Sequence, residues 1–298
     1  NFELVLINDA STDNTLEIMQ DFKEKHSNIK IVNVENNEAF WGNKKYALTL
    51  GIKAATHEYL LFTDADCNPV SSTWISEMTS NFSNEKTIVL GYGKYNVRKS
   101  LVNLCIRFET LLTAVQYFTY AKLGSPYMGV GRNLAYTKAE FFKTKGFINH
   151  IKVKSGDDDL FIQEAANKQN TAINLSPDSF TTSIPPLTFK AWFRQKRRHV
   201  STSSYYQFKH QFFLGLFYLS KLVFYTLTTV LFFFYSWKII ALILTIYLAS
   251  FMTVFGIAAK KFKEPYLLFL LPFLEIFLLL FQFIIFISNT FSKPTHWK

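Results

Sequence analysis

The sequence predicts an α/β domain with a doubly wound, mostly parallel sheet, followed by an all-α membrane region. Two observations lead to this prediction. Short apolar runs with β character alternate with helical patterns over the first two thirds of the chain, and long apolar stretches fill the last third. We expect an α/β domain at 1–189, a basic interfacial segment at 190–210 and a transmembrane region at 211–298.

The α/β part begins with a predicted strand at Glu3–Ile7 that leads into Asn8-Asp9, after which Ser11-Thr12-Asp13 are typical caps for a helix reaching about His26. Further strands are expected at Lys30–Val34, Tyr59–Thr63 and Thr87–Leu90, and a helix at Asn43–Ala54. The chain opens inside strand-like sequence without a Met, so we expect a truncated domain whose first strand is missing.

The last third contains three predicted membrane spans, at about 211–235, 239–259 and 266–288, each long enough to cross a bilayer. Residues 190–298 carry 13 Lys/Arg and 2 Asp/Glu, whereas 1–189 carry 19 and 20. The basic residues before the first span and those at 260–263 predict a cytoplasmic side shared with the α/β domain, with the 236–238 turn and the C-terminal tail outside. A basic excess confined to apolar sequence favours a lipid bilayer over nucleic acid as the partner.

Lys221 and Glu275 are the only Lys, Arg, Asp or Glu residues inside these spans, and we place them at similar depth. Isolated charges at that depth are costly, so we expect them to pair or to share a polar pocket. The alternative is that Lys221 extends to the inner headgroups and Glu275 is protonated or bonded to another helix. The two cysteines, Cys67 and Cys105, lack the spacing of a zinc site or a disulfide framework.

Acidic residues mark the ends of two predicted strands. Asp9 follows the first, and the pair Asp64 and Asp66 follows Tyr59–Thr63. Ligands bind at the carboxyl ends of strands in sheets of this kind. Two carboxylates at i and i+2 can hold a hard divalent cation beside a substrate diphosphate. The competing interpretation of the pair is a solvated turn.

Two more charged clusters follow. Gly156-Asp157-Asp158-Asp159 precedes a helical pattern, and a carboxylate within it could take a proton from an attacking hydroxyl. An acidic helix N-terminus would explain the same residues through the helix dipole. Gln195-Lys196-Arg197-Arg198-His199 is a positive-inside flank that could also supply an arginine to phosphate oxygens. We expect this segment to lie along the membrane surface, with Arg198 turned toward the diphosphate and Lys196 toward lipid.

In order along the chain, these elements resemble the family 2 glycosyltransferases, especially the membrane-embedded synthases of the cellulose, hyaluronan and poly-N-acetylglucosamine type. The resemblance runs from Asn1 to about His199 and continues loosely through the membrane helices. It implies a nucleotide-sugar-binding domain of the GT-A type. The matching motifs are Asn8 to Asp13, Gly42 to Leu48, Asp64 to Asp66, Gly156 to Leu160 and Gln195 to His199.

The resemblance also implies roles. Asp9 would contact the base or ribose of the nucleotide, Asp64 would lie near the ribose and the metal, and Asp66 would ligate the metal, Mg²⁺ or Mn²⁺. Asp157 would be the catalytic base, with Asp158 as the alternative if the register differs by one residue. We therefore expect Asp64, Asp66 and Asp157 to converge around one cleft.

In the last motif, Gln195 and Arg198 would lie near the acceptor and the diphosphate. His199 stands where the family motif has Trp, which puts processive synthesis in doubt. The loop Met128–Asn133 resembles a glycine-bearing loop near the donor and acceptor sugars.

The implied reaction is an inverting transfer of a sugar from a nucleotide sugar, a UDP-sugar first among the candidates, to a hydroxyl of a glycan or lipid-linked acceptor at the cytoplasmic membrane face. Two alternatives from other classes remain. A membrane-anchored nucleotidyl- or phosphotransferase could use the same fold and acidic pair. A non-catalytic membrane scaffold would have no need of carboxylates at strand ends.

Overall fold

The computed structural model describes residues 2–35, 43–153 and 155–292. The amino-terminal unit consists of β1 (Leu4–Asp9) and β2 (Ile29–Val34), which pair in parallel and are connected by α1 (Thr15–Lys25). Asn8 donates from Nδ2 to Oδ1 of Asn33 at 2.7 Å and so ties the carboxyl ends of the two strands together. The α1 helix begins later than the sequence suggested, because Asn14 is its N-cap and Asp13 accepts from the Thr15 amide at 3.1 Å.

The central sheet has the strand order β3-β7-β5-β8. Its strands are β3 (Tyr59–Phe62), β5 (Ile88–Leu90), β7 (Leu134–Thr137) and β8 (Thr171–Ile173). β5 and β8 run parallel, whereas β7 is antiparallel to both of its neighbours. β5 and β7 are buried along their whole length. The strands predicted at 59–63 and 87–90 are confirmed, while β7 and β8 are elements that the sequence analysis did not propose.

A second, three-stranded sheet has the order β4-β9-β6 and extends the domain toward the membrane helices. Its members are β4 (Cys67–Pro69), β6 (Gly93–Tyr95) and β9 (Thr181–Ser183). The shorter helices of the domain are α2 (Asn43–Ala54), α3 (Trp74–Thr79), α5 (Lys138–Lys143) and α6 (Asp159–Ala165), with 3₁₀ turns η1 (Ile148–His150) and η2 (Pro177–Ser179). α2 packs closely on β1, because a Cβ on Gly51 would lie 2.3 Å from Cδ1 of Ile7.

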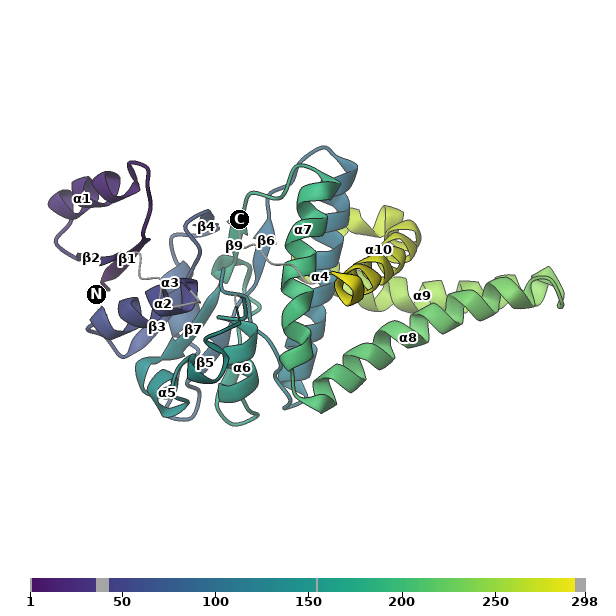
Figure 1. Cartoon of the computed structure of the whole chain (residues 1–298). Coiled ribbons are helices and arrows are strands. Elements are labelled where there is room, and N and C mark those ends of the chain that lie inside the picture. The colour runs from purple at the N-terminus through teal and green to yellow at the C-terminus, as the bar shows by residue number, and fades with distance from the viewer. Residues whose placement is uncertain (1, 36–42, 154, 293–298) are drawn as a thin grey trace.

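Two helices of the domain pack against the carboxyl-terminal third of the chain. α4 (Leu101–Lys122) has buried side chains along most of its length and contributes Phe108, Leu111 and Tyr117 to the main hydrophobic core. The aromatic side chains of α4 therefore pack in the core. α7 (Phe189–Val200) lies beside α4 and is followed by the 3₁₀ turn η3 (Ser201–Tyr205) (Figure 1).

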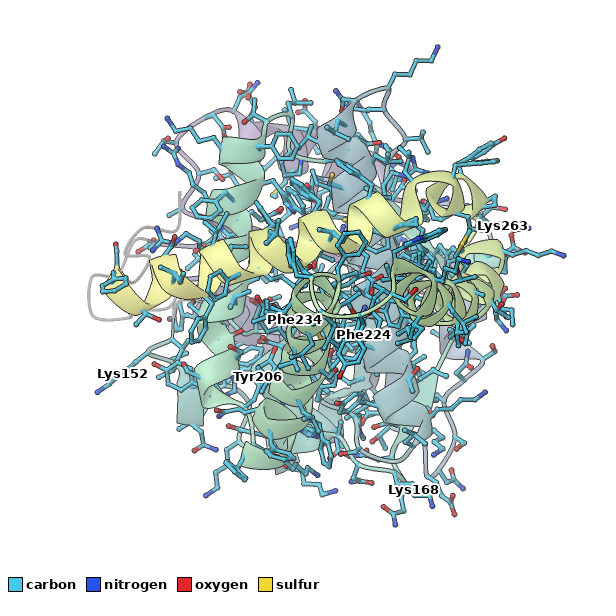
Figure 2. The ribbon with its side chains drawn as sticks, turned by 90° about the vertical axis from the view of Figure 1, so that its right-hand side faces the viewer. Lys152, Lys168, Tyr206, Phe224, Phe234 and Lys263 are labelled. Carbon is cyan, nitrogen blue, oxygen red and sulfur yellow. The ribbon has the colours of Figure 1, made fainter. Side chains whose placement is uncertain are left out.

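Three helical segments are long and apolar enough to cross a membrane: Phe208–Leu231, Trp237–Lys261 and Pro265–Phe291. They comprise α8 (Phe208–Leu231), α9 (Trp237–Lys261), the 3₁₀ turn η4 (Pro265–Leu270) and α10 (Leu271–Phe291). α8 and α9 form a hairpin that projects away from the α/β domain (Figure 1). Seen along the hairpin in Figure 2, α10 runs across it.

The return from α9 to η4 is inserted into the α/β domain. The Phe262 ring packs edge-on against Tyr92, with 4.7 Å between ring centroids, and lies close to Phe180 at 5.8 Å. Glu264, 1% exposed, pairs with the buried Arg107 of α4. Separating these two side chains would leave a buried charge unpaired, which is strongly destabilising. The ion pair therefore holds the turn between α9 and η4 against the domain.

The carboxyl end of α10 also contacts the domain side of the molecule. Phe281 stacks on Trp192 of α7 with 4.1 Å between ring centroids, and Arg197 Nε donates to Asn289 Oδ1 at 2.8 Å. Ser288, predicted to mark the outer end of the third span, instead accepts from Arg197 through its carbonyl at 3.1 Å. The prediction that this end of α10 lies on the outer side with the 236–238 turn is therefore wrong for the residues described.

The predicted pairing of Lys221 with Glu275 is confirmed. Lys221 Nζ lies 2.6 Å from Glu275 Oε1, and the hydroxyl groups of Tyr225 and Tyr247 donate to the same carboxylate at 2.8 and 2.5 Å. The ammonium group also lies over the ring of Phe251, 4.4 Å from its centroid. The carboxylate thus joins α8, α9 and α10 through three donors.

Candidate active site

The site is organised around one lysine between two acidic segments. Lys44, in the first turn of α2, lies with Nζ 2.9 Å from Asp157 Oδ2 and 3.2 Å from Asp64 Oδ1. Burial lowers the pKa of Lys44, but the nearby carboxylates, Asp157 foremost, outweigh burial and raise it above its ordinary value. The two acidic residues thus share one ammonium group, although 93 positions separate them in the sequence. Asp64 and Asp157, which the sequence predicted to lie in one cleft, are brought together.

The acidic loop before α6 is held by backbone groups. Asp158 is the N-cap of α6; its Oδ1 accepts from the Asp159 amide and its Oδ2 from the Gly131 amide, both at 2.8 Å. Burial raises the pKa of Asp158 to about 7, and the charges of Asp157 and Asp159 act in the same direction. A Cβ on Gly131 would lie 3.6 Å from Oδ2 of both Asp157 and Asp158, so this glycine keeps space open beside the carboxylates.

The third carboxylate of the cluster points away from this space. Asp159 is 6% exposed, and its Oδ2 accepts from Thr202 Oγ1 at 2.5 Å and from Tyr206 OH at 2.6 Å. Its Oδ1 accepts from the Leu160 amide at 2.8 Å. The helix-capping interpretation therefore applies to Asp158, whereas Asp157 faces Lys44. The role of Asp157 as a base stays a prediction.

A second acidic group lies between β3 and β4. Asp64, Asp66 and Cys67 each offer one ligand atom, and these atoms all lie within 4.8 Å of one another. Asp66 is exposed, whereas Asp64 and Cys67 are half-buried. Burial raises the pKa of the Cys67 thiol to about 11, and the charges of Asp66 and Asp64 act in the same direction. The thiol is thus protonated at neutral pH, and the two carboxylates are the groups suited to a hard cation such as Mg²⁺ or Mn²⁺.

The basic motif lies on α7, where Gln195 and Arg198 are three residues apart and share a face of the helix. Gln195 Nε2 donates to Tyr95 OH of β6 at 3.4 Å. Burial lowers the pKa of Arg198, while the negative charges of Asp157 and Asp64, together with Tyr95, act to raise it. Arg198 therefore lies within electrostatic range of both acidic segments.

The position of Lys196 contradicts a prediction made from the same motif. It was expected to point toward lipid, but its Nζ lies 2.6 Å from Glu109 Oε1 on α4 and its side chain is only 18% exposed. Thr113 Oγ1 donates to the same carboxylate oxygen at 3.0 Å. The pair connects α7 to α4, so Lys196 is part of the packing between these helices.

The loop between α4 and β7, which contains Gly131 and Asn133, lies next to the acidic residues. Asn133, fully buried, donates from Nδ2 to the carbonyl oxygens of Tyr92 and Ser179 at 3.0 and 2.7 Å, and its Oδ1 accepts from the indole of Trp74 at 3.1 Å. The Arg132 guanidinium lies over the ring of Tyr95, 4.3 Å from its centroid. These bonds fix the loop that carries Gly131 next to the acidic residues.

Asp9 occupies the exposed carboxyl end of β1, in the separate two-stranded sheet. Ala10, which follows it, has a φ of +52°, a left-handed conformation that turns the chain sharply at this point. The contacts that join Lys44, Asp64 and Asp157 involve α2, the β3–β4 turn and the α6 loop. The role of Asp9 in holding a nucleotide stays a prediction.

The sequence analysis did not identify several residues that contribute to the site. Lys44 was part of a matching motif but had no assigned role, and Tyr95 was not considered. Lys45, which is buried, donates from Nζ to the carbonyl oxygens of His150, Val153 and Ser155 at 2.8, 2.9 and 2.7 Å. The available signal was the adjacent lysine pair at the start of a predicted helix, where the helix dipole disfavours cations unless acidic partners are near.

Comparison with known proteins supports the resemblance. A model of glycosyl transferase family 2 matches residues 1–136. The poly-beta-1,6-N-acetyl-D-glucosamine synthase of Staphylococcus epidermidis is 47% identical over 64 residues, which cover 22% of this chain and 14% of that protein. A Bacillus subtilis protein named "Probable glycosyltransferase YdaM" is 26% identical over 219 residues, 71% of this chain and 50% of that protein. The chain thus spans half or less of the length of these curated relatives.

Among solved structures, the mannosyltransferase PcManGT from Pyrobaculum calidifontis, in complex with GDP-Man and Mn²⁺, aligns with a TM-score of 0.54 at 16% identity. The alignment covers 90% of this chain and 75% of that one. The likeness concerns the fold. It confirms the predicted α/β class of the GT-A type, followed by apolar helices able to span a membrane.

Proposed function

We propose that the chain transfers a sugar from a nucleotide-sugar donor to a hydroxyl of a glycan or lipid-linked acceptor, in line with the match of residues 1–136 to the model of glycosyl transferase family 2. One observation carries the proposal. Lys44 bridges Asp64, on the side expected to hold the donor, and Asp157, the expected base. A donor sugar bound beside Asp64 and an acceptor hydroxyl bound beside Asp157 would lie next to each other, close enough to react.

In this proposal Asp157 takes the proton of the acceptor hydroxyl while its oxygen attacks the anomeric carbon. The C–O bond to the nucleoside diphosphate breaks on the opposite face of the sugar, so the configuration inverts. Arg198 stabilises the departing diphosphate through charge-assisted hydrogen bonds, and Gln195 orients the acceptor. Asp158, bonded to two backbone amides, is the alternative base, and Asp9 contacts the base or ribose of the nucleotide.

The carboxylates of Asp64 and Asp66 fit a divalent cation, because two oxygen donors lie within 4.8 Å of each other at an accessible turn. When bound, Mg²⁺ or Mn²⁺ would offset the negative charge of the diphosphate. The solved mannosyltransferase with a similar fold holds GDP-Man and Mn²⁺. We take a UDP-sugar as the first donor to test here, and a GDP-sugar as the second.

We place the reaction at the cytoplasmic face of the membrane. The basic residues before α8 and those at Lys260, Lys261 and Lys263 favour that side by the positive-inside rule. The return after α9 is buried against the α/β domain through Phe262 and Glu264, so domain and return share one side. Neither a nucleotidyl- or phosphotransferase nor a membrane scaffold is favoured, because the family match covers both Asp9 and the Asp64–Asp66 pair.

The test uses the purified protein in lipid nanodiscs with a panel of UDP- and GDP-sugars, and measures release of UDP or GDP. One donor should be turned over, EDTA should abolish the release, and Mn²⁺ or Mg²⁺ should restore it. Asp66→Ala should behave like the EDTA-treated protein, whereas Asp21→Asn, an exposed carboxylate change on α1, should match the wild type. Absence of release with every donor, alone and with membrane lipid extracts as acceptor, would reject the proposal.

A further inference from the structure

The loop that carries Asp157 is fastened to the segment that enters the first membrane helix. Asp159, two residues after Asp157, accepts hydrogen bonds from Thr202 Oγ1 at 2.5 Å and Tyr206 OH at 2.6 Å. Both hydroxyls belong to the stretch between α7 and α8. Thr202 Oγ1 also lies 2.8 Å from the carbonyl oxygen of His199, the last motif residue of α7, so its single proton is shared between the carboxylate and this carbonyl. Tyr206 is labelled in Figure 2.

This carboxylate is poorly suited to proton transfer and well suited to holding position. All three of its bonds come from donors inside the protein, the third being the Leu160 amide at 2.8 Å. A carboxylate that is 6% exposed is costly to bury unless such donors compensate. With both hydroxyls on Oδ2 and the amide on Oδ1, an acceptor sugar would have to displace native bonds to reach it.

A second set of bonds joins the same two segments one helical turn further on. Gln163 of α6 accepts through Oε1 from the Gln207 amide at 3.2 Å and lies 2.9 Å from Nδ1 of His210. Gln207 Nε2 donates to the Gln163 carbonyl at 2.7 Å. Both partners of Gln163 lie at the start of α8, so α6 is docked along the juxtamembrane segment.

We propose that Asp159, Thr202 and Tyr206 form a clasp that positions the base Asp157 relative to Arg198. The inference rests on the proposed function and adds a positioning residue to it. Arg198 lies one helical turn before Thr202, and Asp157 lies two residues before Asp159, so the clasp connects the two segments that carry Arg198 and Asp157. Because Asp159 reaches α8 through Tyr206, the geometry of the base depends on how the first membrane helix is seated.

The clasp is tested with the isosteric variants Thr202→Val and Tyr206→Phe, alone and together, in the full chain in nanodiscs. Thr202→Ser keeps the hydroxyl, and Tyr205→Phe removes the hydroxyl of the neighbouring, 61% exposed tyrosine. The double variant should lower kcat about tenfold to a hundredfold, since small misplacements of reacting groups cost this much, with KM for the donor within about twofold. Thr202→Ser and Tyr205→Phe should keep the wild-type kcat. An unchanged kcat in the double variant, or a change confined to KM, would overturn the proposal.

Hydrogen–deuterium exchange of the same variants provides a readout independent of turnover. The double variant should exchange faster over 156–166 and over 128–133, because the Gly131 amide bonds to Asp158 in the same loop, while α4 should be unchanged. Equal exchange in variant and wild type would refute the clasp. If the wild type turns over no donor, the proposed function fails, and the exchange data still decide whether the clasp holds the loop.

Discussion

At the scale of single residues, the site depends on how four carboxylates are distinguished by their neighbours. Asp157 faces Lys44, Asp158 accepts from two amides, Asp159 accepts from two hydroxyls, and Asp64 shares the lysine. The sequence could identify the acidic clusters because they follow strands or precede a helix. It could not separate the surroundings of Asp157, Asp158 and Asp159, because those depend on distant partners: Lys44 lies 113 positions from Asp157, and Tyr206 lies 47 positions from Asp159.

Lys44→Met should lower kcat about tenfold to a hundredfold, because it leaves Asp64 and Asp157 facing each other without the intervening charge. The variant should also bind Mn²⁺ more tightly in the absence of donor, since a competing cation has been removed from Asp64. Steady-state turnover and calorimetric titration with Mn²⁺ measure the two effects. Lys53→Met, on the same helix, is the control. A Lys44→Met enzyme with wild-type kcat would show that the bridge has no part in the reaction.

The raised pKa of Asp158 predicts a pH effect on stability. Its pKa is about 7 in the folded protein against an ordinary value of 3.8, so the folded state holds the proton more tightly. This stabilisation is fully present below about pH 3.8 and is lost as the pH rises through about 7. Between pH 5.5 and 8, the wild-type Tm should therefore fall by a few degrees more than that of Asp158→Asn in metal-free buffer. Parallel Tm curves for the two proteins would contradict the assignment.

At the scale of elements, prediction succeeded where a local pattern decides the structure. The strands at 59–63 and 87–90 and the helix at 43–54 were found from the spacing of their apolar residues. β4, β6, β7, β8 and β9 were missed, because none of them has three large apolar residues in a row, as β3 and β5 do, and their pairing depends on partners in the sheet. Lys196 was misplaced for a similar reason: its partner Glu109 is 87 positions away.

Two cations of α7, Lys196 and Arg198, have different surroundings, so their substitutions should have different effects. Arg198→Ala should lower kcat about a hundredfold or more with little change in Tm, since it would remove the charge-assisted contact that we propose with the diphosphate. Lys196→Ala should lower the free energy of unfolding by about 1–3 kcal/mol, because it leaves the buried Glu109 without its cation. Turnover and thermal unfolding are measured for both, with the exposed Arg194→Ala as the control. Equal, small effects on kcat would favour a pure topology signal.

At the scale of the whole molecule, the apolar helices α8 to α10 and the α/β domain are joined at several points. Arg107 pairs with Glu264, and the ring of Phe262 lies among core aromatics of the domain. The sequence predicted the apolar helices from length and hydropathy. It also predicted the Lys221–Glu275 pair, but from a similar depth that assumed an outer end for α10 near Ser288, which the structure contradicts. It could not predict that the end of α10 lies against α7, because that contact depends on stacking between Trp192 and Phe281.

The Lys221–Glu275 pair should hold the three helices together. Lys221→Met should destabilise the protein by about 3 kcal/mol, the cost of leaving one charge unpaired at depth. Lys221→Glu and Glu275→Lys should each lower Tm, and the double exchange should recover part of the loss. Lys238→Met, at the start of α9 outside this cluster, is the control. Additive losses in the double exchange, measured by thermal unfolding in nanodiscs, would show that the two charges are not coupled.

We propose that Asp157 is the base of a nucleotide-sugar-dependent transfer. Asp157→Asn, an isosteric change, tests this role in an assay that measures donor binding and product formation separately. The variant should bind the donor with wild-type affinity, while sugar transfer should fall by about a thousandfold or more. An Asp157→Asn protein that transfers sugar at the wild-type rate would contradict it.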